Sequence, residues 1–406
     1  MNLSYFISKR ITSEAKGTFS STIHKIAIGS ITLGLAVMIV SFLILKGFQN
    51  TVTEKIYSFS SHLQVTKYTL GNSYEESPIS INNAVFEHFE DYDLIKHVQP
   101  YSHKAGLLKT EEEILGIIFK GVGEQFNLEL FNENLVEGRF IDFSGESYAK
   151  EVVISQTIAD KLRLQKDDEI IIHFFMDPPR VRKLKVVGIY ETNLADYYDD
   201  KFILGDIRLI QRLNNWADTL AGGLEVFVKD IDKIEEAESM LDDVLDYDLF
   251  VEKVSDKYIQ VFEWLFLISR QVNIFLGIIL FVVCVNMISI ILILIMERTR
   301  MIGLLKAFGA TDHQVRAIFA YNGINLIIKG LLGGNLVGIG LCLLQYHYKI
   351  ISLNPSDYYM SYVPIGWNWQ VILGLNILTF VVVSLIIVIP TLVITRITPI
   401  KSIKFD

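Results

Sequence analysis

The 406-residue chain has few cysteines and lacks the catalytic signatures that are easiest to recognise. Its two cysteines, Cys284 and Cys342, both lie inside long hydrophobic stretches, which excludes a disulfide framework and a Cys-x-x-Cys metal site. There is no glycine-rich phosphate loop ending in Gly-Lys-Ser/Thr, no His-Glu-x-x-His zinc motif, no Gly-x-Ser-x-Gly turn and no glycine-rich dinucleotide turn. We therefore predict that the chain is not an enzyme and holds no metal or cofactor of its own.

Charged residues are missing from four long tracts. Residues 26–45, 271–296 and 358–395 contain no Asp, Glu, Lys or Arg, and the tract 317–348 contains only Lys329. A helix of about 20 apolar residues is long enough to span a bilayer. The sequence therefore excludes a soluble enzyme and predicts a membrane protein with four transmembrane α-helices.

The net charge of −9 is divided unevenly along the chain. Residues 1–46 and 270–406 hold 15 Lys+Arg and 5 Asp+Glu, a balance of +10, whereas residues 47–269 hold 22 and 41, a balance of −19. So acidic a domain repels phosphate, and we expect no nucleic-acid partner. Basic residues precede the first tract, separate the second from the third and follow the fourth. Since basic segments favour the cytoplasmic side, residues 47–269 are predicted to lie outside, in the periplasm.

These signals predict the order of segments along the chain. The first tract is too long for the core of a cleaved signal peptide and lacks a cleavage site, so it is expected to be a membrane anchor. The predicted segments are a cytoplasmic N-terminal segment (1–25), transmembrane helix 1 (26–47), a periplasmic domain (48–268), transmembrane helix 2 (269–296), a cytoplasmic loop (297–314), transmembrane helix 3 (315–344), a periplasmic loop (345–367), transmembrane helix 4 (368–395) and a cytoplasmic tail (396–406).

The large domain shows strand and helix patterns in alternation, which predicts an α+β fold in two lobes. Strands are expected at 62–68, 105–109, 114–122, 151–154, 169–175, 183–190, 224–229 and 249–254, and helices at 156–164 and 231–245. The hairpin of 105–109 and 114–122 is indicated by the acidic turn between its strands.

The cytoplasmic loop is the most informative segment. Its apolar residues follow the spacing i, i+1, i+3, i+4 and i+7, which predicts one apolar stripe on a short helix: Met301, Ile302, Leu304, Leu305 and Phe308. Gly309 is a good helix terminator, and Thr311 with Gln314 fits a capping box that begins the third membrane helix. Such a helix either lies on the lipid interface or fits a groove in a cytoplasmic partner.

Residues 297–310 resemble the Glu-Lys/Arg-x-x-x-Ile-Ala/Gly-Ile/Leu-Leu-Lys/Arg-Ala-Leu/Phe-Gly-Ala signature of the FtsX-like permeases. In that superfamily the segment is a coupling helix that docks on an ABC ATPase. The resemblance implies that ATP and Mg²⁺ are bound by a separate partner ATPase. It also implies a set of ATPase-coupling residues, namely Glu297, Arg298, Met301, Ile302, Gly303, Leu305, Lys306, Phe308 and Gly309.

Further motifs resemble the lipoprotein-releasing permeases, the LolC/LolE group. Gly47-Phe48-Gln49 is similar to the end of their first span, and the run from Asn354-Pro355 through Tyr358-Tyr359 to Val363-Pro364 is similar to their outer loop. Pro390, Arg396 and Pro399 resemble their closing tail, although only two residues separate Arg396 from Pro399. LolC-like members carry a longer hook for a periplasmic carrier where this chain has the short turn 175–182, in which Arg180 and Arg182 are the candidate carrier contacts.

This resemblance implies a permease subunit that pairs with a second copy or a paralogue in the inner membrane of a Gram-negative-type bacterium. Together with the ATPase, the pair would release lipoproteins toward the outer membrane, with membrane lipid and a periplasmic carrier as further partners. Met38, Phe42, Phe275 and Phe281, on the first two spans, are the candidate lining of a lipid pocket. The alternatives are a MacB-like mechanotransmission permease for efflux or envelope stress, and an FtsX-like subunit that controls a cell-wall hydrolase.

Two features of the third span stand apart from these motifs. Lys329 either reaches toward cytoplasmic headgroups or is a buried charge paired within the complex. A stripe of small residues recurs every four positions, at Gly330, Gly334, Gly338 and Cys342. This spacing predicts a face that packs closely on another helix, and we expect that neighbour to be the fourth or second span.

Overall fold

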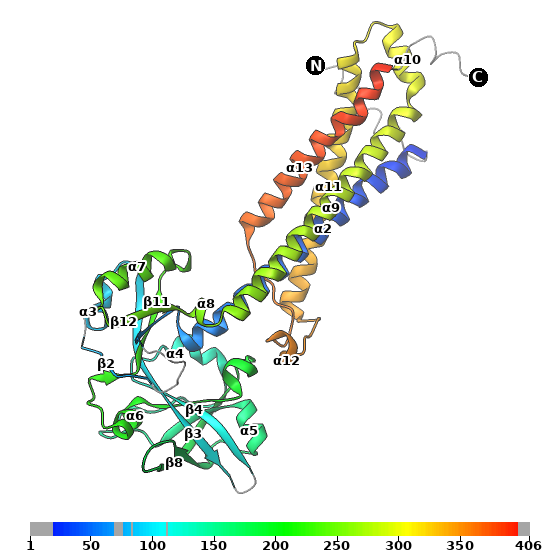
Figure 1. Ribbon diagram of the computed structural model, residues 1–406. Coiled ribbons are helices and arrows are strands. Elements are labelled where there is room, and N and C mark those ends of the chain that lie inside the picture. The colour runs from blue at the N-terminus through cyan, green and yellow to red at the C-terminus, as the bar shows by residue number, and fades with distance from the viewer. Residues whose placement is uncertain (1–18, 69–75, 83, 111–112, 397–406) are drawn as a thin grey trace. The chain divides into compact units, whose positions relative to one another are not determined.

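Figure 1 shows the computed structural model of the chain, which describes residues 19–68, 76–82, 84–110 and 113–396. The ends of the predicted cytoplasmic segments, residues 1–18 and 397–406, lie outside the described residues. The chain divides into two compact units. We call the unit of residues 1–50, 264–352 and 362–406 the helical unit, and the unit of residues 51–263 and 353–361 the α+β unit.

Four helices of the described chain are long and apolar enough to cross a membrane. They are α2 (Phe19–Ser60), α9 (Ile259–Glu297), α11 (Asp312–Tyr348) and α13 (Trp369–Thr391). The prediction of four apolar helices around one large domain is thereby confirmed. At about 1.5 Å per residue, α2 and α9 are far longer than the roughly 30 Å of a hydrocarbon core. Both helices therefore continue beyond their predicted spans, and their outer ends belong to the α+β unit.

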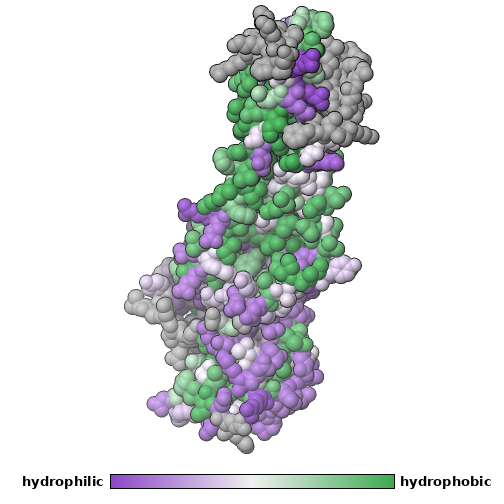
Figure 2. Space-filling model, turned by 90° about the vertical axis from the view of Figure 1, so that its right-hand side faces the viewer, coloured by the Kyte–Doolittle hydropathy of each residue, from purple (hydrophilic) through white to green (hydrophobic). Residues whose placement is uncertain are grey.

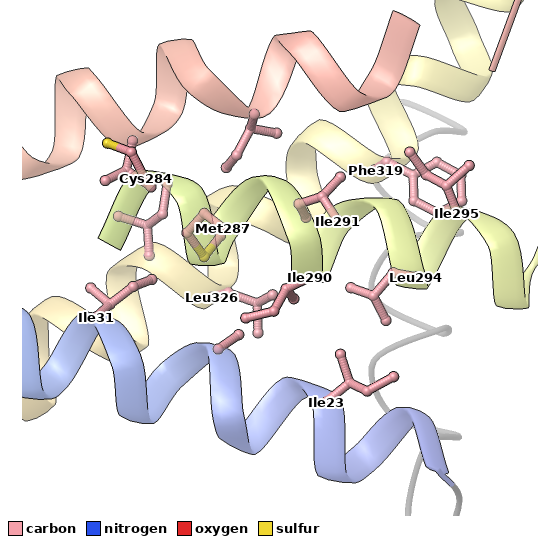
Figure 3. Close-up of a cluster of buried hydrophobic side chains, with 14 of the residues drawn as sticks. Ile23, Ile31, Cys284, Met287, Ile290, Ile291, Leu294, Ile295, Phe319 and Leu326 are labelled. Atoms are coloured by element: carbon pink, nitrogen blue, oxygen red, sulfur yellow. The ribbon is translucent and has the colours of Figure 1, made fainter. Parts of the chain in front are cut away.

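The helices of the helical unit pack around a core of branched aliphatic side chains. Figure 3 shows Ile31 of α2, Met287 of α9 and Leu326 of α11 pointing toward one another. In the face drawn in Figure 2, hydrophobic residues dominate the surface of the helical unit and hydrophilic residues dominate that of the α+β unit. Large side chains of the helical unit such as Leu336 and Leu385 are exposed, as expected for helices surrounded by lipid.

The link between α9 and α11 is the short helix α10 (Thr299–Ala307). Gly309 adopts a left-handed conformation with φ of 93°, which ends this helix without steric cost. The Thr311 hydroxyl accepts from the Gln314 amide at 3.3 Å, and the Gln314 side chain accepts from the Thr311 amide at 2.9 Å. The predicted capping box at the start of α11 is thus confirmed.

A ten-stranded sheet organises the described part of the α+β unit. Its strand order is β12-β1-β11-β3-β4-β9-β6-β8-β5, and β7 pairs with both β3 and β8. The strands are β1 (Leu63–Lys67), β3 (Ile95–Lys109), β4 (Ile114–Val122), β5 (Leu135–Gly138), β6 (Glu151–Ser155), β7 (Glu169–Phe174), β8 (Arg180–Tyr190), β9 (Phe202–Asp206), β11 (Gly223–Val228) and β12 (Leu249–Lys253). A separate pair consists of β2 (Ile79–Ser80) and β10 (Leu220–Ala221).

Strand pairing divides the unit into two lobes, as predicted. In one lobe, β3, β4, β9, β6, β8 and β7 form a closed ring, because each strand pairs with the next and β7 pairs back to β3. Helices α5 (Gln156–Leu162) and α6 (Ile207–Asn214) contribute to the core of this barrel. In the other lobe, α7 (Ile234–Val244) packs on the sheet of β12, β1, β11 and the first half of β3.

The end of α2 is held in the α+β unit by buried polar groups. Lys120 of β4 is 1% exposed, donates to the Phe59 carbonyl and pairs with Glu225 of β11 at 2.6 Å. Burial lowers the pKa of Lys120, while Glu225 opposes this shift. The Phe59 ring stacks on Tyr198 with ring centroids 4.2 Å apart. Since cations are stabilised at helix C-termini, Lys120 anchors the last turn of α2 between the two lobes.

Candidate functional site

Helix α10 has one face packed in the helical unit and one face that is exposed among the described residues. Ile302 is fully buried and Gly303 is also buried, and Met301 and Leu305 pack on the same core cluster. By contrast, Phe308 is 86% exposed. The predicted apolar stripe is therefore divided, because its inner part completes the core of the helical unit.

Polar residues of the predicted coupling set are divided in the same way. The Lys306 ammonium donates to the Ile394 carbonyl at 2.7 Å and pairs with Asp312 at 2.8 Å, so it ties α10 to α11 and to the segment after α13. Arg298 is half-buried, whereas Glu297 and Gly309 are exposed. The nine predicted coupling residues thus do not form one surface.

The free side of α10 is a small apolar surface with a basic edge. Its residues follow helical spacing, at i, i+4, i+7 and i+8, and all of them are exposed. We call this the α10 face; it consists of Arg300, Leu304, Ala307 and Phe308. Leu304 belonged to the predicted stripe, but Arg300 and Ala307 were not among the predicted coupling residues. The geometry suits a partner with an apolar pocket, since exposed aromatic side chains are frequent anchors of interfaces.

The glycine stripe of α11 faces α2. A Cβ atom added to Gly330 would lie 2.6 Å from the Ile31 Cβ, and one added to Gly334 would lie 2.8 Å from the Leu35 Cβ. At Gly338 the nearest atom is the Ala36 Cα, 3.1 Å away. The expectation that the stripe packs on the second or fourth span is wrong, because the small residues let the first helix approach closely.

Further contacts support the pairing of α2 and α11. Cys342, the last member of the stripe, is 1% exposed and lies in a core cluster with Leu35. The Thr32 hydroxyl donates to the Gly330 carbonyl at 3.2 Å, which adds a polar contact between the two helices. Hydrogen bonds of this kind contribute to helix association in membranes.

The residues predicted to line a lipid pocket differ in burial. Met38 is 1% exposed and belongs to a core cluster with Cys342 of α11. Phe42 is half-buried, while Phe275 and Phe281 of α9 are 50% and 67% exposed. Because α2 turns Met38 toward the other helices of its unit, this residue contributes to packing and not to an open surface.

The two arginines predicted to contact a carrier already have contacts within the α+β unit. The turn between β7 and β8 is short, residues 175–179, as the sequence indicates. Arg180 donates to the carbonyls of Arg212 and Leu213 at the end of α6, which satisfies carbonyl groups that the helix leaves unpaired. Arg182 donates to the carbonyl of its neighbour Val181.

Lys329 is exposed and lies within about two helical turns of the level of Lys25 on the neighbouring helix. Asn322 of α11 contacts His24 of α2 at 3.4 Å, and Gly330 lies opposite Ile31. In this register Lys329 is about five residues, or roughly 8 Å, farther along than Lys25. Lys25 marks the cytoplasmic end of the first charge-free tract. The geometry therefore favours a Lys329 side chain that extends toward cytoplasmic headgroups.

Two of the quoted motifs meet in the helical unit. Gly47 of α2 lies against Gly366, and a Cβ atom on Gly47 would be 2.6 Å from the Gly366 nitrogen. The Gly366 amide donates to the Leu43 carbonyl at 2.9 Å. The adjacent Phe48 ring contacts Trp264 of α9 edge-on, with centroids 5.5 Å apart. Glycine is required here because two backbones cross in contact.

Among the described residues, no group of three or more His, Cys, Asp or Glu side chains is placed so that it could hold a metal ion.

Two family models match the chain: the FtsX-like permease C-terminal region over residues 273–399, and the MacB-like periplasmic core domain over residues 26–244, more than half of the chain.

Curated relatives align with the chain over most of their length. LolE of Haemophilus influenzae, a lipoprotein-releasing system transmembrane protein, is 22% identical and covers 91% of both chains. LolC of the same organism is 23% identical over 84% of both chains. The ABC transporter permease YtrF of Bacillus subtilis is 23% identical over 73% of this chain and 69% of its own. The solved periplasmic region of MacB from Actinobacillus actinomycetemcomitans is 15% identical, covers 50% of this chain and 92% of that one, and has a TM-score of 0.34.

Proposed function

The chain belongs to the ABC transporter permeases that join a MacB-like periplasmic core domain to an FtsX-like permease region, and from this premise we propose that it releases lipoproteins from the inner membrane toward the outer membrane. The proposal is supported by relatives named for lipoprotein release that align over most of both chains. Withdrawing a lipid anchor costs about 0.8 kcal/mol for each buried CH₂ group. Release therefore needs an energy source, which we assign to ATP and Mg²⁺ on a separate ATPase subunit.

The observation that carries the proposal is the α10 face. It offers the exposed Phe308 and Leu304 to a cytoplasmic partner, while Ile302 fixes the same helix to the core. We propose that the ATPase receives Phe308 in an apolar pocket and moves α10 together with the start of α11. A second permease chain, identical or paralogous, would complete the transporter.

Phe308→Asp tests this docking. An aromatic anchor contributes about 2 kcal/mol or more to an interface, so ATPase affinity should fall roughly 30-fold or further. The amount of permease in the membrane should not change, because Phe308 does not belong to the described core. Met301→Asp is the matched control: it places a charge against the core cluster and should lower the amount of permease itself. Co-purification of the ATPase with the Phe308→Asp variant at the normal ratio would refute the docking assignment.

A second candidate function is mechanotransmission for efflux or envelope stress. It is favoured by the match of residues 26–244 to the MacB-like periplasmic core domain. Reconstitution separates the two candidates. Vesicles with the permease, its ATPase and a fluorescent lipoprotein should lose the lipoprotein to a soluble acceptor when ATP is added. ATP hydrolysis without any release of lipoprotein would favour mechanotransmission.

A further inference from the structure

The loop between α11 and α13 has its tip in the α+β unit. Residues 353–361 belong to that unit, although the helices they connect belong to the helical unit. The base of the tip is closed by a hydrogen bond from the Leu353 amide to the Ser361 carbonyl at 2.9 Å. The tip contains the single turn α12 (Pro355–Tyr358) and Met360, whose side chain is only 4% exposed. A methionine so well buried indicates that the tip is packed and not free in solvent.

A lysine near the end of α2 holds this tip. The Lys55 ammonium donates to the Tyr359 carbonyl at 3.0 Å and to the Thr192 carbonyl at 2.7 Å. The three residues are far apart in sequence and all lie in the α+β unit. Hydrogen bonds from an ionised donor are roughly twice as strong as those between neutral groups. Lys55 therefore joins α2, the segment after β8 and the loop tip through one charged group.

Thr192 is itself held in place, so Lys55 binds to a fixed point of the α+β unit. Asp199 is 2% exposed and accepts from the Thr192 hydroxyl at 2.8 Å and from the Thr192 amide at 3.2 Å. Burial raises the pKa of Asp199, and the bonds from Thr192 oppose that shift. Asp199 also offers the Lys55 ammonium an opposite charge at longer range.

We infer that Lys55 clamps the loop tip of residues 353–361 to the α+β unit, so that this unit moves with the loop. The loop is covalently joined to α11 and α13, and α11 follows α10 directly. The α+β unit would then be driven through the loop as well as through α2 and α9. The mechanical role rests on the proposed function, whereas the clamp itself does not.

Met360→Cys provides a reporter for the clamp in the full-length chain. With Cys284 and Cys342 replaced by alanine, a soluble maleimide can react at residue 360 only when the loop tip detaches. Lys55→Met should raise the labelling rate about tenfold, which corresponds to roughly 1.4 kcal/mol and lies near the lower end of what hydrogen bonds to charged groups contribute. Lys150→Met, which removes an exposed lysine of the same unit, is the matched control and should leave the rate unchanged.

Two further measurements separate the clamp from general damage and from the transport proposal. The double variant Lys55→Met with Asp199→Asn removes both charges, so that the Asp199 carboxylate is not left without the lysine. It should also raise the labelling rate at residue 360 about tenfold, because the hydrogen bonds from the charged lysine are lost. A rate equal to that of the parent in both variants overturns the clamp. In vesicles with the ATPase, Lys55→Met should lower the lipoprotein released per ATP hydrolysed. Faster labelling with unchanged release would overturn the mechanical role and leave both the clamp and lipoprotein release in place.

Discussion

Alanine at position 47 would test how tightly α2 packs on the segment before α13. An added Cβ atom would lie 2.6 Å from the Gly366 nitrogen and 2.7 Å from the carbonyl carbon of Pro364. Both are backbone atoms, so no side chain can rotate out of the way. The segment must move, and the hydrogen bond from the Gly366 amide to the Leu43 carbonyl moves with it.

Three contributions set the size of the effect. Overpacking costs roughly 1–3 kcal/mol, and loss of one hydrogen bond costs about 0.5–1.5 kcal/mol. Alanine is favoured over glycine in a helix interior by about 1 kcal/mol, which offsets part of the loss. The free energy of unfolding of Gly47→Ala should therefore fall by about 0.5–3.5 kcal/mol.

Gly29→Ala is the matched control on the same helix. No atom of the described residues lies within 4 Å of a Cβ atom at Gly29, so this variant should keep or gain stability. Thermal unfolding in one detergent, followed by the fluorescence of the four tryptophans, compares the two variants. Equal midpoints would refute the tight crossing. A lowered midpoint for Gly29→Ala alone would show that the crossing has been placed at the wrong glycine.

Two more predictions concern the helix pair and the α+β unit. Gly334→Leu should lower the free energy of unfolding by roughly 1–3 kcal/mol and reduce the amount of folded protein in membranes, because a Cβ atom there would lie 2.8 Å from the Leu35 Cβ. Gly340→Leu is the control, since a Cβ atom at Gly340 has no described neighbour within 4 Å, and equal immunoblot signals for the two variants would contradict the prediction. Burial lowers the pKa of His62 to about 4, below the value of about 6.5 in an unfolded chain, so stability should fall as the pH drops from about 6.5 to 4. His62→Asn keeps an acceptor for the Val228 amide and should flatten that pH dependence, and an unchanged stability curve would refute the assignment.

The helices were predictable because the signals that specify them are local. A charge-free tract of 20 or more residues requires a helix in lipid, whatever the rest of the chain does. The capping box of Thr311 and Gln314 is likewise complete within four residues. The helix ends were less predictable: α2 continues to Ser60 because its last turn is stabilised by Lys120, which lies far away in the sequence.

The strand β3 shows why part of the sheet was missed. Its last third, 105–109, was predicted, but the strand begins at Ile95. The missed part contains buried polar side chains, among them Gln99 and His103. They are satisfied by long-range partners, since Gln99 donates to Glu225 at 2.7 Å and His103 contacts Glu76 at 2.6 Å. A polar segment with distant partners does not show the alternation that identifies a strand.

The coupling segment combines a local signal, which was predictable, with long-range contacts, which were not, within one short helix. Its apolar residues cover both sides of α10, and periodicity alone does not say which side faces the protein's own helices. Ile302 and Gly303 set how α10 rests on the helical unit, and Lys306 ties it to Asp312. One part of the family signature therefore positions α10 on the helical unit, and another part forms the docking surface that we propose. Within the described residues, Phe308 and its exposed neighbours are the part of α10 left for a partner, so substitutions there should separate ATPase binding from folding.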